Sequence, residues 1–134
     1  MHPTISEQLR GLSKALADVV APELTNPYPS DVLSGVIGAL DTLAQSWQEL
    51  PAYLRWDAEA TAAVLTRRGV EPPHPPADPL DIDALEAHHA AVRGLLERLV
   101  PQLAADPDTN AATVALFRER IERFPFNQLA PRRQ

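Results

Sequence analysis

The residues with the clearest capacity for chemistry are two adjacent histidines, His88 and His89, with Glu86 just before them. Glu86 and His89 have the Glu-x-x-His spacing by which carboxylate-rich helical bundles hold metal ions. Such a site also needs a second copy of the pair and two further acids, and the chain has no second copy. On a helix, Glu86 lies on a different side from the two histidines, which flank the apolar stripe. Metal binding at His88 and His89 is therefore an alternative hypothesis, and no cofactor is predicted.

A second group of candidates is aromatic and lies close to Pro51. Trp47 falls on the apolar stripe of its helix, whereas Trp56 is expected to point away from the stripe of the next helix, with Tyr53 between the two. Tryptophan is enriched at the centres of protein interfaces. An outward Trp56 indicates an interface anchor or the lip of a pocket, unless the proline-rich connector or Phe126 covers its ring.

Two further residues are expected near these aromatic rings. Leu116 is placed on the outer side of the last helix, so we expect it to extend the same outward patch. Asp57 lies at the edge of a buried stripe, where partial burial is expected to raise the pKa of its carboxyl group. A single acid without a partner does not by itself indicate a catalytic site.

Charge and composition disfavour several classes of function. The 134 residues include 12 Lys and Arg against 18 Asp and Glu, for a formal net charge of −6, and there is no cysteine. The basic residues form no continuous stripe of the kind that binds phosphates. No apolar run approaches the roughly 20 residues of a membrane span, and the start of the chain lacks a secretory signal. We therefore expect a cytoplasmic protein that binds neither nucleic acid nor membranes.

Apolar residues recur at steps of three and four along several stretches, which predicts helices with one buried side each. The stripes contain Leu9, Leu12, Leu16 and Val19; Leu33, Val36, Leu40, Leu43, Trp47 and Leu50; Leu85, Val92, Leu99 and Leu103; and Val114, Phe117, Ile121 and Phe124. The predicted fold is all-α, an antiparallel bundle of four principal helices in a single domain spanning residues 1–134. A break at Pro51 would add a fifth helix, either by a kink or by the tight reversal that we favour.

Capping signals and prolines set the expected boundaries. A capping box at Thr4 and Glu7 opens the first helix, and Gly69 is a plausible stop for the third. Two glycines, Gly35 and Gly38, lie off their apolar stripe and suggest the close approach of another backbone. The helices are expected at about 4–20, 30–49, 53–68, 79–100 and 107–124, with Asp78 and Asp106 as the N-caps of the last two. Proline-rich connectors are expected at about 21–29 and 70–79, with a tail at 125–134.

Two hypotheses about function remain. The first is a non-enzymatic interaction or accessory protein that self-associates as a homodimer or serves a larger enzyme complex, with Trp47, Tyr53, Trp56 and Leu116 at an interface or pocket. The alternative is a small-molecule-binding or metal-dependent helical-bundle enzyme that uses His88 and His89, with Asp57 beside them. No serine-nucleophile elbow or phosphate-binding glycine loop supports the second hypothesis.

Overall fold

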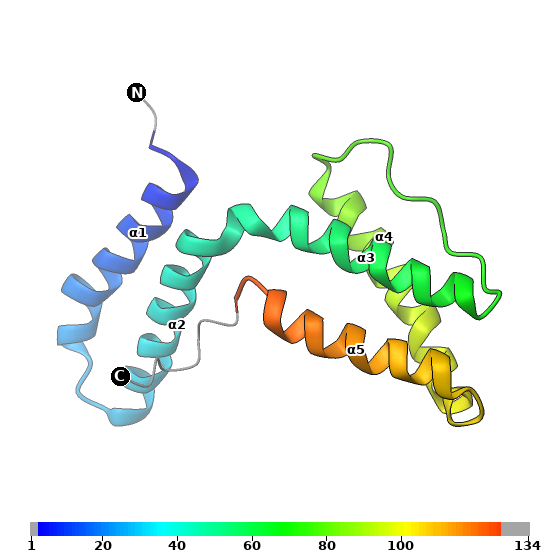
Figure 1. The fold of residues 1–134 in the computed structure, drawn as a ribbon. Helices are drawn as coiled ribbons and strands as arrows, with labels where there is room; N and C mark the ends of the chain where they lie inside the picture. The colour runs from blue at the N-terminus through cyan, green and yellow to red at the C-terminus, as the bar shows by residue number, and fades with distance from the viewer. Residues whose placement is uncertain (1–2, 127–134) are drawn as a thin grey trace. The chain divides into compact units, whose positions relative to one another are not determined.

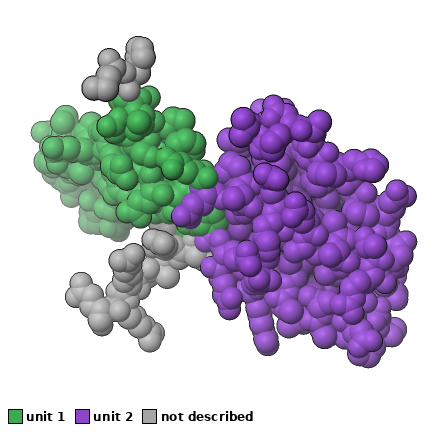
Figure 2. Space-filling view, turned by 45° about the horizontal axis from the view of Figure 1, so that its top comes forward, with its two compact units in different colours: residues 1–48, 125–134 green, residues 49–124 purple. Residues whose placement is uncertain are grey.

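A computed structural model describes residues 3–126, and within this range the ordered elements are all helical. The all-α prediction is therefore confirmed. The chain divides into two compact units, residues 1–48 with 125–134 and residues 49–124, which Figure 2 colours green and purple. The assignment of the whole chain to one domain stays a prediction.

The first unit contains a helical hairpin. Helix α1 (Ile5–Ala15) continues through a π-helical turn (Leu16–Val20) and a 3-10 turn (Ala21–Glu23), and α2 (Pro27–Ser46) runs back beside it (Figure 1). The expected capping box is present: Thr4 Oγ1 accepts a hydrogen bond from the backbone N–H of Glu7, and Glu7 Oε2 accepts one from the N–H of Thr4. These bonds satisfy amides that a helix N-terminus leaves without partners.

Helix α2 begins earlier than expected, which shortens the predicted connector at 21–29. Pro27 and Pro29 lie in its first turn, where the missing N–H groups would have no intrahelical partner in any case. At its other end a 3-10 turn (Trp47–Glu49) separates α2 from α3 (Leu50–Arg67). Pro51 therefore occupies the first turn of a separate helix, and the α-helical pattern is interrupted just before it.

The second unit is built from α3, α4 (Ile82–Leu99) and α5 (Pro107–Arg123), with a 3-10 segment (Val100–Ala105) before α5. Gly69 ends α3 as predicted. Its φ of 78° is the left-handed conformation, its N–H donates to Thr66 O, and the N–H of Val70 donates to Leu65 O. This is the Schellman arrangement, in which the residue after the glycine also packs on the core, as Val70 does.

The start of α4 differs from the expected position. The predicted helix began at Pro79, but Asp81 is the N-cap and accepts from the N–H of Ala84, while Asp78 accepts from the N–H of Leu80 in a turn before the helix. At α5 the predicted Asp106–Pro107 start is confirmed, with Asp106 accepting from the N–H of Thr109. An aspartate therefore caps both helices. At α4 the cap is Asp81 and not Asp78, because Asp78 accepts its hydrogen bond in the turn before the helix.

The core of the second unit contains Val64, Leu65, Val92, Leu96 and Leu116. Leu116 is only 5% exposed, so the prediction that it faces outward is wrong. Helix α5 buries the side that carries Thr109, Thr113 and Leu116, and it leaves Val114 and Phe117 at 41% and 38% exposure. The predicted stripe on this helix misled because threonine and arginine, rather than aliphatic residues, accompany Leu116 on the buried side.

Gly35 and Gly38 do not mark a close approach of another backbone. A Cβ atom built at either position would meet nothing within 4 Å, so that prediction is wrong. None of the helices within residues 3–126 is both long enough and apolar enough to cross a membrane.

Two glycine-to-alanine changes should have opposite effects on stability. Gly38→Ala places a better helix former at an open position in α2 and should raise the free energy of unfolding by about 0.5–1 kcal/mol. Gly69→Ala forces a left-handed residue at the end of α3 and should lower it by about 1 kcal/mol or more. Urea denaturation of both variants measures the difference. A loss of stability in Gly38→Ala would contradict the open space around this position.

Candidate functional site

The hairpin of α1 and α2 buries little of itself. On these two described helices the fully buried residues are Ser13, Ala44 and Ser46, which are small or polar. Ser13 Oγ donates a 2.6 Å hydrogen bond to Asp41 Oδ1 and so joins α1 to α2. The buried residues of this hairpin are therefore small or polar, and its aliphatic residues, such as Leu9, Ile37 and Leu40, are half-buried or exposed.

Trp47 completes the hairpin at the end where α2 finishes. Its indole Nε1–H donates to Ser6 Oγ at 2.9 Å, and Ser6 Oγ donates to Ala44 O at 3.0 Å. A half-buried tryptophan finds a partner for its N–H while its ring packs, which is its usual arrangement. Trp47 therefore joins α1 to the last turn of α2 through a contact inside the hairpin.

The largest unexplained feature of the hairpin is a set of exposed aliphatic side chains. Ile5 and Leu12 on α1, and Val32, Val36 and Leu43 on α2, are between 40% and 57% exposed. We call these five residues the hairpin face. Single exposed aliphatic residues are ordinary on protein surfaces, but a grouped set is typical of an interaction surface.

The five side chains lie on the same side of the hairpin. On α1, Ile5 and Leu12 are rotated about 100° from the direction of the contacts with α2. On α2, Val36 and Leu43 are rotated about 120° from the contacts with α1, and Val32 about 150°. The rotations have the same sign along each chain. Because the two helices are antiparallel, rotations of the same sign bring both sets to one side of the plane that contains the helix axes.

Neither α1 nor α2 carries a charged residue on the side of the hairpin face. The 20 residues of α2 include only two charged side chains, Asp31 and Asp41, and both lie more than about 100° away from the hairpin face on a helical wheel. The charged residues of α1 are likewise on its other sides. A helix that is uncharged around most of its circumference is typical of a buried position. Helix α2 therefore has more apolar surface than α1 alone covers.

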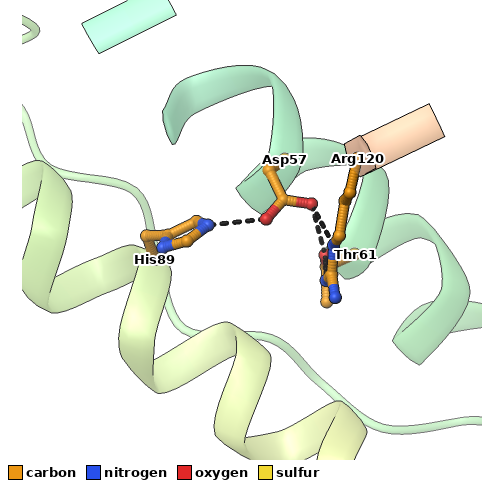
Figure 3. A network of polar contacts seen from close by, with 4 residues as sticks. All are labelled: Asp57, Thr61, His89 and Arg120. Carbon is orange, nitrogen blue, oxygen red and sulfur yellow. Dashed lines mark hydrogen bonds and ion pairs between the residues drawn. The ribbon is translucent and has the colours of Figure 1, made fainter. Parts of the chain in front are cut away.

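The second unit contains a buried polar network instead (Figure 3). Asp57 on α3 is 0% exposed, and its Oδ2 lies 2.6 Å from Nε2 of His89 on α4. Arg120 on α5 donates from Nε to Asp57 Oδ1 at 2.5 Å and from a terminal nitrogen to Thr61 Oγ1 at 2.6 Å. One carboxylate thus bonds to groups from both neighbouring helices and ties α3, α4 and α5 together.

The pKa of Asp57 is lowered, so the predicted rise is wrong. Burial by itself raises the pKa, but the hydrogen bonds from His89 and Arg120 and the charge of Arg120 outweigh it. This bond could not be predicted from the sequence because Arg120 is 63 residues away along the chain. The nearby Tyr53 has a raised pKa, caused first by burial and next by the charge of Asp57.

The two histidines that suggested a metal site serve different contacts. His89 bonds to Asp57, whereas Nε2 of His88 lies 3.1 Å from the carbonyl oxygen of Pro73 in the connector. Within residues 3–126 there is no group of three His, Cys, Asp or Glu side chains placed to hold a metal ion. Glu86 is exposed.

The aromatic candidates form a cluster in the second unit. The ring of Tyr53 lies 5.9 Å from that of Trp56 and 5.5 Å from that of Phe124. Trp56 is half-buried and packs against the core, and the guanidinium of Arg123 lies 4.5 Å above its ring. The ring of Trp56 is therefore covered in part by Arg123 from the last turn of α5, through a cation–π contact.

No family model, curated protein or solved structure matches this chain.

Replacing the buried carboxylate tests the network directly. Asp57→Asn should lower the free energy of unfolding by about 3–5 kcal/mol at neutral pH, because Arg120 would remain buried without its counter-charge. Folding lowers the pKa of Asp57, so its contribution is present above the unfolded value, near pH 4, and is lost as the pH falls below it. Urea denaturation over an acid-to-neutral pH series measures both effects.

The matched control for this test is Glu97→Gln, at an exposed acid on α4. It should change stability little at any pH. Equal acid sensitivity in Asp57→Asn and the unmodified protein would contradict the role given to Asp57.

Proposed function

We propose that this protein acts without catalysis, as an interaction protein that self-associates through the hairpin face of α1 and α2. The observation that carries the proposal is an exposed, uncharged apolar surface on a hairpin whose helices fully bury only Ser13, Ala44 and Ser46. Two such hairpins packed face to face make a four-helix arrangement with an apolar centre. Each hairpin then buries the surface that it cannot bury alone.

A second copy of this chain suits the face better than an oppositely charged partner. The chain carries a net charge of −6, so two copies repel each other at long range. The hairpin face has no charged side chain, so a twofold contact places no like charges against each other at its centre. A twofold interface also needs a surface complementary to itself, and a smooth patch of valine, leucine and isoleucine meets that need.

The expected affinity is moderate. Burying an aliphatic side chain contributes about 1.5–3 kcal/mol when it is fully exposed beforehand, and the ten residues of two faces are roughly half exposed. Their sum is on the order of 10 kcal/mol, which is comparable with the cost of bringing two molecules together. Self-association should therefore depend on protein concentration within the range of ordinary solution measurements.

Single charges placed on the hairpin face should abolish self-association. Val36→Glu or Leu12→Glu puts two carboxylates into an apolar twofold contact, where neither has a partner. We expect the unmodified protein to shift from monomer to dimer with rising concentration in sedimentation velocity, and each variant to stay monomeric. Circular dichroism of the variants should show an unchanged helical content, because these side chains are exposed in the monomer.

The matched control is Leu80→Glu, which adds the same charge at a residue that is 84% exposed in the connector of the other unit. It should dimerise like the unmodified protein. Loss of dimer in Leu80→Glu as well would attribute the effect to net charge. A monomer at all concentrations would overturn self-association and leave a different protein, such as an enzyme subunit, as the partner to seek.

A further inference from the structure

Beside α3 in the second unit, two adjoining hollows form a cleft that the interaction function does not use. Each has a volume of about 280 Å³, and they share Ala58, Glu59, Pro75 and His88. The connector between α3 and α4 forms one wall, as it passes along these helices in Figure 1. Volumes of a few hundred cubic ångströms are those of small-molecule sites.

The floor of the cleft is apolar and built from small residues. Leu54, Ala58 and Leu85 are buried and come from α3 and the first turn of α4. Ala62 continues the floor toward the end of α3. Alanine side chains line the middle of the cleft, and the space beside them is open among the described residues.

The proline-rich wall is stiff and lacks donors. Pro72, Pro73, Pro75 and Pro76 have no N–H groups, and their rings restrict the backbone to extended conformations. The contact between His88 Nε2 and Pro73 O, 3.1 Å long, fastens this wall to α4. At these four positions the backbone therefore has carbonyl acceptors but no amide donors.

The glutamate side chains that line the cleft are hydrogen-bond acceptors. Glu59 lines both hollows and Glu71 lines one of them, whereas Arg55 lies only along the other. Within the described residues neither glutamate has an ion-pair partner within 4 Å. A ligand with hydrogen-bond donors and positive charge matches this set, since ionised acceptors bind such donors most strongly.

We propose that this cleft binds a small primary amine with a compact apolar body. The ammonium group is held by the Glu59 carboxylate and proline carbonyl oxygens, and the apolar part lies on Leu54, Ala58 and Leu85. The negative charge of the chain favours the approach of cations over anions. Nothing in this site involves the hairpin face, so its test is independent of self-association.

Chemical-shift titration of the ¹⁵N-labelled full chain tests this site with three probes of similar size. Phenethylamine should shift the amides of Ala58, Glu59 and Leu85, whereas neutral 2-phenylethanol and anionic 3-phenylpropionate should bind at least about tenfold more weakly, the loss expected for one charge-assisted bond. Glu59→Gln should weaken phenethylamine binding by about tenfold for the same reason. Glu97→Gln, at an exposed acid on α4 that does not line the cleft, should leave phenethylamine binding unchanged.

A second variant tests the space as opposed to the charge. Ala62→Leu should fill part of the cleft and weaken the binding of the amine, with the helical content retained because position 62 is only half-buried. Equal binding of the three probes, shifts confined to other residues, or equal losses in Glu59→Gln and Glu97→Gln would each overturn the proposal.

Discussion

A buried carboxylate determines how the three helices of the second unit pack. An ionised Asp57 with no exposed surface is tolerable only when charged or polar groups satisfy it, and His89 and Arg120 do so from two different helices. Arg120 must then point inward, so α5 is rotated to place Thr113 and Leu116 on the same buried side. The exposure of Val114 and Phe117 follows from that rotation. The polar contact thus sets which face of α5 is buried, and apolar packing by Leu116 follows it.

The hairpin presents the opposite situation. Its buried residues are small or polar and form short polar bonds, such as those of Ser13 and Trp47, while its aliphatic side chains are half-buried or exposed. Hydrogen bonds of this kind contribute about 1 kcal/mol each and specify the pairing of α1 with α2 more than they stabilise it. Two helices with no large buried side chain between them gain stability chiefly by burying their remaining apolar surface elsewhere. This need, rather than any reactive group, is the basis of the proposed self-association.

The sequence predicted the features that local chemistry controls. The capping box at Thr4, the stop at Gly69 and the start at Asp106 were all visible in a few adjacent residues, and the helical class followed from the three- and four-residue steps. The bond between Asp57 and Arg120 was not predictable, because it joins residues 63 positions apart and gives no periodic signal. The burial of Leu116 and the contact of Arg123 with Trp56 were likewise not predictable, because both depend on how α5 packs against distant parts of the chain.

Self-association of this kind requires two hairpin faces to meet, and a single spin label on the face reports that contact. The chain has no cysteine, so Ala39→Cys, beside Val36 and Leu43 on α2, accepts one nitroxide per molecule. Packed helices are about 8–10 Å apart, so labels at two apposed faces should give one intermolecular distance on the order of 20–30 Å in pulsed dipolar spectroscopy. The coupling should vanish when labelled protein is diluted with an excess of unlabelled chain. Dimers that show no such distance at Ala39→Cys would exclude contact between two hairpin faces.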